Sequence, residues 1–73
     1  IDGIRVQDNS GVNLGRDTGT NPDELPNNTT ANNTGFGIRC FRGGYADGRL
    51  GTLNGASGDK DFNDSTCVDS LIP

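Results

Sequence analysis

The chain has 73 residues and a net charge of −4, from 10 acidic and 6 basic residues, with no histidine. Only 29% of the residues are hydrophobic and 12 are glycine, so the composition predicts one small domain with a thin apolar core. Nucleic acid phosphates attract clustered Lys and Arg, which an acidic chain lacks. No apolar run approaches the roughly 20 residues that a membrane-spanning helix needs. We therefore expect neither nucleic acid binding nor a membrane span.

Two short segments near the N-terminus predict a pair of strands. Ile4 and Val6 fall on one face, as do Val12 and Leu14, and the residues between the two segments are polar. Alternation with a period of two is typical of a half-buried strand, and an Asn-Ser-Gly turn is typical of a hairpin. The two segments are therefore expected to pair with each other in a hairpin.

Residues 16–34 predict a long polar surface loop, because Gly, Asn, Thr, Asp and two prolines dominate them. Three Asn-x-Ser/Thr acceptor sequences lie here, at Asn27, Asn28 and Asn32, and a fourth lies at Asn63. N-linked glycans and unmodified polar side chains are the two alternatives at these four positions.

The most regular strand pattern covers residues 35–41, where Phe36, Ile38 and Cys40 are expected to share the core face. Cys40 and Cys67 are the only cysteines. In a Gly/Asn/Thr-rich chain with a weak core they predict a structural disulfide in an oxidising compartment. Two unrelated buried thiols are the alternative.

A second Gly-rich stretch and a short strand complete the chain. Leu50 and Leu53 are expected core contacts, and residues 67–72 predict the closing strand. Residues 1–73 are thus expected to form one small all-β, loop-rich domain. We expect a short antiparallel sheet, long Gly/Asn-rich loops and one disulfide. Because the chain starts at Ile1, we expect any leader to have been removed or to belong to another part of a precursor.

The densest polar cluster contains Asp59, Asp61, Asn63 and Asp64. Their alternation resembles the way calcium loops present oxygen ligands to a hard cation. It is not an EF-hand, because the sixth position is Asp64 instead of Gly and the twelfth is Ser70 instead of Glu. A Ca²⁺ site and a solvated acidic loop are the two interpretations.

Catalytic groups are scarce. Without histidine the serines lack their usual general base, and the two cysteines are expected to be bonded to each other. Acid–base chemistry by Asp59 and Asp61 would need a cleft that desolvates one of them, and a domain this small offers little depth. The sequence therefore predicts that the chain is not an enzyme.

Two cysteines that enclose a C-terminal loop, the second close to the end of the chain, resemble the disulfide-bounded C-terminal region of type IV pilins and pseudopilins. Residues 45–49 and 59–64 are similar to the Gly/Asp-rich, calcium-holding loop of major pseudopilins. In that family an apolar helix builds the filament core and the β domain decorates the outside. The resemblance implies either a split pilin, whose helix comes from a separate chain, or a processed globular part.

A second, local resemblance involves residues 34–40, Thr-Gly-Phe-Gly-Ile-Arg-Cys. They are similar to the closing strand of bacterial surface domains related to formylglycine-generating enzyme, and residues 42–44 resemble an Arg-Gly-Gly stretch of that superfamily. Those domains are much longer and rich in Trp, so this resemblance carries over no catalytic residue.

Together these features predict a non-enzymatic structural or interaction subunit of an extracellular, pilus-like filament or surface assembly. Neighbouring subunits would supply the burial that this chain lacks. The expected core or contact residues are Phe36, Ile38, Phe41, Leu50, Leu53 and Ile72. The alternative is a secreted calcium- or carbohydrate-binding module that uses the acidic cluster.

Overall fold

The computed structural model describes residues 1–15 and 33–72. This part of the chain forms six strands, which are β1 (Ile4–Val6), β2 (Gly11–Asn13), β3 (Phe36–Cys40), β4 (Tyr45–Arg49), β5 (Gly58–Asp61) and β6 (Val68–Ile72). The same residues contain no helix that is long and apolar enough to cross a membrane.

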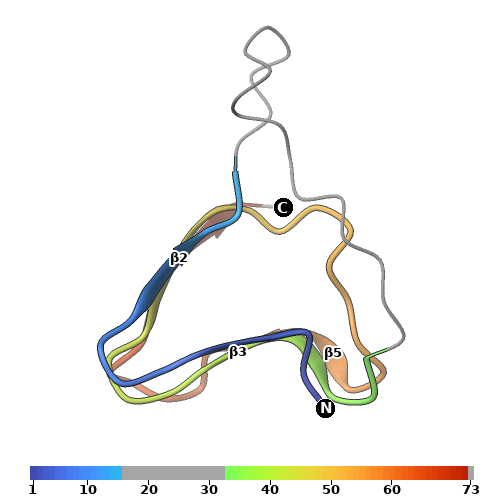
Figure 1. Ribbon diagram of the computed structural model, residues 1–73, viewed down its shortest axis with the longest axis horizontal. Helices are drawn as coiled ribbons and strands as arrows, with labels where there is room; N and C mark the ends of the chain where they lie inside the picture. The colour runs from blue at the N-terminus through green and yellow to red at the C-terminus, as the bar shows by residue number, and fades with distance from the viewer. Residues whose placement is uncertain (16–32, 73) are drawn as a thin grey trace, which may run out of the picture.

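The six strands form two parallel three-stranded sheets. Sheet A has the order β1-β3-β5 and sheet B the order β2-β4-β6. Each pair of consecutive strands makes one coil: coil 1 contains β1 and β2, coil 2 contains β3 and β4, and coil 3 contains β5 and β6. Figure 1 looks along the coil axis, with the two sheets along two sides of a triangle and residues 50–57 along the third. The architecture is therefore a short parallel β-solenoid.

The expected antiparallel sheet and N-terminal hairpin are wrong, although both strands of the hairpin exist. β1 pairs with β3 and β2 pairs with β4, both in parallel, so the two strands lie in different sheets. Period-two alternation identifies a strand and its buried face, but it does not identify the partner strand. Parallel partners need a long crossover, and here each crossover is the remainder of a coil.

The tight turn predicted between β1 and β2 is present, and a similar turn occurs in every coil. In the turns at residues 7–10, 41–44 and 64–67 the last N–H donates to the first carbonyl, at 3.2, 3.1 and 3.0 Å. In the first two turns both central residues have positive φ, between 45° and 75°. Hairpin turns use the same backbone conformation, which is why the sequence favours a hairpin here. In this fold the turns stack and form the corner between the two sheets.

The core lies between the two sheets and residues 50–57. Its buried apolar residues, each at most 3% exposed, are Val6, Ile38, Cys40, Ala46 and Leu53. Partly buried apolar side chains packed against them are Ile4, Val12, Leu14, Leu50, Phe62 and Leu71. The expected core positions of Ile38, Leu50 and Leu53 are thus confirmed. With so few buried side chains, hydrophobic burial alone gives limited stability.

Phe36 does not share the core face with Ile38 and Cys40, as the alternation predicted. The Arg39 guanidinium carbon lies 5.2 Å from the centroid of the Phe36 ring, and Arg39 faces outward from sheet A. Gly37, next to Phe36, is buried. The strict alternation therefore breaks at the start of β3, where the chain turns into the sheet.

Gly44 fixes how closely the corner packs on the core. A Cβ atom there would lie 2.5 Å from the Cys40 Sγ and 2.8 Å from the Val6 carbonyl oxygen. We expect Gly44→Ala to lower the free energy of unfolding by about 1–3 kcal/mol, because the added methyl forces the corner and the disulfide apart. Urea denaturation under oxidising conditions measures it.

The matched control is Ser65→Ala, which changes an exposed side chain at the same corner. It should leave the urea midpoint close to that of the unmodified chain. Equal stability of the Gly44→Ala variant and this control would show that the close approach at Gly44 does not limit packing.

Candidate functional site

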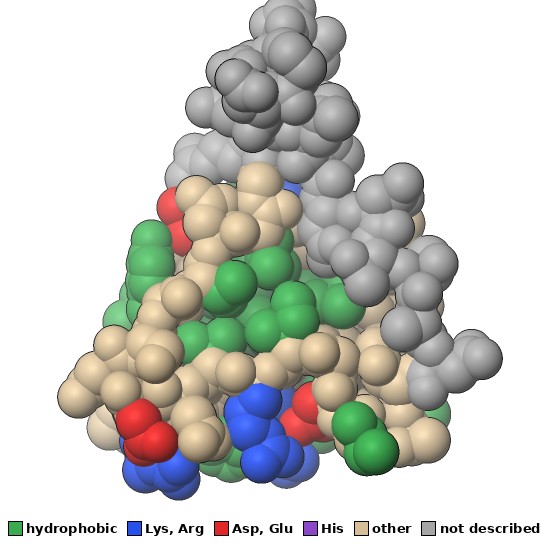
Figure 2. Space-filling model, in the orientation of Figure 1, with side chains coloured by type: hydrophobic (Ala, Val, Ile, Leu, Met, Phe, Trp, Pro, Cys, Tyr) green, Lys and Arg blue, Asp and Glu red, His purple; other side chains and the backbone are tan. Residues whose placement is uncertain are grey.

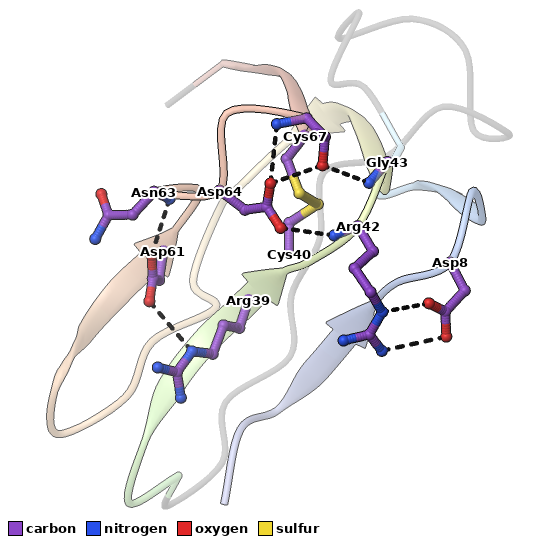
Figure 3. The surroundings of a disulfide bond; sticks show 10 residues. Asp8, Arg39, Cys40, Arg42, Gly43, Asp61, Asn63, Asp64 and Cys67 are labelled. Carbon is purple, nitrogen blue, oxygen red and sulfur yellow. Dashed lines mark hydrogen bonds and ion pairs between the residues drawn. A yellow bond between two sulfur atoms is a disulfide. The ribbon is translucent and has the colours of Figure 1, made fainter.

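The disulfide links two successive coils at the corner of the triangle. Cys40 ends β3 in coil 2, Cys67 lies just before β6 in coil 3, and their Cα atoms are 6.2 Å apart (Figure 3). The expected pairing is confirmed, and the alternative of two separate thiols is removed. Cys40 Sγ lies inside the corner with only 1% of the residue exposed. The bond therefore attaches the last coil to the core.

The turn of coil 3 binds to coil 2 mainly through side chains. The Arg42 N–H donates to Asp64 Oδ2 at 2.8 Å, and the Gly43 N–H donates to Thr66 Oγ1 at 2.8 Å (Figure 3). Asp64 Oδ1 also accepts from the N–H and the hydroxyl of Thr66, at 2.9 and 2.6 Å. The Arg42 N–H, and then the Thr66 hydroxyl and N–H, lower the pKa of the Asp64 carboxyl to about 2. Side chains of coil 3 thus accept hydrogen bonds from the backbone N–H groups in the turn of coil 2.

Arg42 also reaches in the opposite direction, to coil 1. Its guanidinium donates through two nitrogens to both oxygens of Asp8. This bidentate hydrogen bonding lowers the pKa of Asp8 and raises that of Arg42. A shallow, open hollow of about 470 Å³ lies here, and its lining comprises Asp8, Asn9, Arg42, Gly43, Asp64 and Thr66. One residue of coil 2 therefore connects the turns of all three coils.

The four acidic-cluster residues predicted to bind calcium are not gathered into one site. Asp61 Oδ2 accepts from Arg39 Nε at 3.1 Å, and Asp61 Oδ1 accepts from the Asn63 N–H at 3.0 Å. Asp64 holds the turn of coil 2, and Asp59 lies exposed on β5. Across residues 1–15 and 33–72, no three acidic, His or Cys side chains cluster closely enough to hold a metal ion. Asp61 and Asp64 therefore attach coil 3 to coil 2.

Of the four predicted glycosylation sites, the structure describes one. Asn63 is exposed at the corner of coil 3. Asn27, Asn28 and Asn32, with nearly all of the predicted loop at residues 16–34, lie outside the described residues. Glycosylation of Asn63 remains a prediction that its exposure permits.

The outer face of sheet A carries a stack of cations and aromatic rings. The Arg39 guanidinium carbon lies 5.2 Å from the ring centroids of both Phe36 and Phe41, and that of Arg5 lies 5.5 Å from Phe41. Such contacts contribute about 0.5–1 kcal/mol each at exposed sites. Phe41 is thus an outer-face contact of sheet A.

Two aspartates balance the arginines on this face. Asp2 Oδ2 lies 3.3 Å from the Arg5 guanidinium and 4.0 Å from that of Arg39, and Asp61 pairs with Arg39. The Phe36 N–H, which donates to Asp2 Oδ1 at 2.9 Å, is the main reason that the pKa of Asp2 is lowered. The charges on this face are therefore paired with one another.

The outer face of sheet B is different, because apolar side chains are exposed on it. Tyr45 and Val68 are register partners on adjacent strands and are 43% and 53% exposed. Ile72, expected as a core or contact residue, ends β6 on the same face and is 44% exposed. We call Tyr45, Val68 and Ile72 the sheet B patch. No signal in the sequence identified Tyr45 and Val68, since their exposure depends on which face of sheet B packs inward.

Comparison with known protein families, with curated proteins and with solved structures finds no match to this chain.

Removing the disulfide should strongly destabilise the fold. The cross-link lowers the conformational entropy of the unfolded chain, and for a sequence separation of 27 residues this is worth about 3.5 kcal/mol. We expect the double variant Cys40→Ala, Cys67→Ala to lose about that much free energy of unfolding, measured by urea denaturation. Reductant should destabilise the unmodified chain similarly and leave the double variant unchanged. A reductant effect on the double variant would contradict this explanation.

The Asp64 carboxylate should titrate far below an ordinary aspartate. Its folded-state pKa of about 2 lies below its usual value of 3.8, so its stabilising contribution is complete above about pH 4 and is lost as the pH falls toward 2. Carboxyl carbon NMR measures this titration directly. Thr66→Val removes one donor and should raise the Asp64 pKa. A midpoint near 4 in the unmodified chain would show that the corner hydrogen bonds do not form in solution.

Proposed function

We propose that this chain is a structural and interaction subunit of an extracellular assembly, either a pilus-like filament or a surface layer, and that it is not an enzyme. The sheet B patch carries the proposal. Among the described residues, four large apolar side chains are exposed, and three of them, Tyr45, Val68 and Ile72, lie on this one face. An exposed apolar group set among polar residues is typical of a protein interaction surface.

The register of sheet B supports a flat contact surface. The outward column beside Tyr45 and Val68 contains Asn13, Asp47 and Ser70, which are aligned on β2, β4 and β6. Polar groups beside an apolar patch provide directional hydrogen bonds, while the apolar groups provide burial. A neighbouring subunit placed here would add burial to a chain whose own core is small.

Two features favour the extracellular location. The Cys40–Cys67 bond joins two coils of the fold, and such bonds persist in oxidising compartments. Asn63 presents an exposed acceptor sequence for glycosylation at the same corner. In a pilus-like assembly, a separate helical pilin-like chain would build the filament and this β-solenoid would decorate its surface.

The chemistry of the side chains argues against an enzyme. The chain has no histidine, and both of its cysteines are in the disulfide. Asp61 accepts a hydrogen bond from Arg39, and Asp64 accepts hydrogen bonds from N–H groups of the corner. Neither carboxylate therefore has the environment that a general base needs. These observations support a binding or structural role.

Electron microscopy of the native preparation, combined with sizing of the purified chain, tests this function. We expect regular filaments or a lattice that contains this chain. Val68→Lys should prevent its incorporation, because burying an unpaired ammonium in the contact is unfavourable. A chain that stays outside every assembly in its native preparation would contradict the proposal.

The matched control is Ala56→Lys, which adds the same charge at an exposed position between β4 and β5. It should incorporate normally. If both lysine variants fail to incorporate, the loss reflects net charge and not the sheet B patch.

A further inference from the structure

The inward-facing residues form columns along the coil axis, and these columns end differently at the two ends. In sheet A, one column contains Ile4, Ile38 and Lys60, one residue from each coil. In sheet B, the corresponding column contains Val12, Ala46 and Asp69. Coil 1 therefore continues the apolar columns, whereas coil 3 ends both of them with a charged residue.

At the coil 3 end, these two charged residues cover the core together with the partly buried apolar side chains of Phe62 and Leu71. Lys60 Nζ donates to Asp69 Oδ2 at 2.8 Å, so the pair spans the core from sheet A to sheet B. Directly beneath it in the columns lie Ile38 and Ala46, which are fully buried. Inward-pointing charges on edge strands block the addition of another strand, and polar terminal repeats keep solenoids soluble. Coil 3 is a cap.

Coil 1 has the opposite character. Ile4, Val12 and Leu14 are only partly buried, although they pack against the core. Figure 2 views the molecule from this end and shows apolar side chains gathered in its centre, inside a rim of backbone and polar groups. Within residues 1–15 and 33–72, β1 and β2 each pair with one strand, so their outer edges have no strand partner there. This end offers apolar contact and strand edges together.

Strand edges and apolar columns together specify the kind of occupant, which is another coil. Coil 3 of a second copy does not fit, because Lys60 and Asp69 would be pressed against Ile4 and Val12 and lose their hydration. Coil 1 of a second copy does fit, because apolar columns then meet apolar columns. This orientation also places the acidic coils far apart. Residues 58–72 carry four aspartates and one lysine, whereas residues 1–15 carry two aspartates and one arginine.

We propose that two copies of this chain associate head to head, coil 1 against coil 1, in a closed twofold dimer. Strand edges pair in antiparallel fashion across the contact, and the two capped ends face outward. This dimer would be one contact within the assembly proposed above, so the inference rests on that proposed function.

Sedimentation equilibrium over a range of concentrations tests the dimer. The unmodified chain should pass from monomer to dimer and stop there. Val12→Asp places a charge in the inward column of coil 1 and should weaken dimerisation at least tenfold, whereas Ala56→Asp, at an exposed position between β4 and β5, should not. A monomer at every concentration, or open-ended growth of the unmodified chain, would overturn the proposal.

Hydrogen exchange of the unmodified chain provides a measurement that does not depend on how the variants fold. Amides of β1 and β2 should exchange more slowly as the concentration rises, while those of β5 and β6 should not change. Slower exchange at β5 and β6, or protection of β1 and β2 that is independent of concentration, would overturn the head-to-head contact.

A third variant tests the role of the cap. Lys60→Leu combined with Asp69→Leu makes the inward columns of coil 3 apolar, and it should convert the dimer into longer oligomers. A variant that stays dimeric would contradict the role of this pair.

The dimer and the proposed function fail separately: dimers without filaments or lattices would contradict only the function, and assemblies built from monomers would contradict only the dimer.

Discussion

Each strand of this protein finds its hydrogen-bonding partner one full coil away in the sequence. Ile4 is aligned with Ile38, and Ile38 with Lys60, so no strand is completed by its immediate neighbour in the chain. Contacts of this kind require loop closure before they contribute stability, which makes a short solenoid costly to order. The disulfide between Cys40 and Cys67 reduces that cost for the last coil. The core, the corner and the two ends all follow from this stacking.

The corner shows how the coils are kept in register. Coil 1 and coil 2 are joined there by backbone, through the Asn9 N–H and the Arg42 carbonyl at 3.0 Å. Between positions aligned in the two sheets, coil 3 has one more residue than coil 2, and its turn is joined by the side chains of Asp64 and Thr66 instead. Asp64, which belongs to an acidic cluster that looks like a ligand set in the sequence, is thus an acceptor for backbone donors of the corner.

The sequence allowed the all-β class, most strand positions, the disulfide and the core roles of Ile38, Leu50 and Leu53 to be predicted. These depend on local alternation and on cysteine count, which are visible in one chain. The pairing of strands was not predictable, because the step from Ile4 to Ile38 is longer than the step from Ile38 to Lys60. Unequal coil lengths hide the repeat. Charged residues at two inward positions of coil 3 hide it further, since Lys60 and Asp69 break the apolar pattern of their columns.

The unequal length of the coils has a consequence for the architecture. All of the difference in residue number lies between β2 and β3, whereas the passage from β4 to β5 needs only residues 50–57. Both sheets keep an unbroken register despite it. The stacking of the two sheets therefore does not require coils of equal length. A solenoid built in this way can gain or lose residues between its strands while each sheet keeps its strand register.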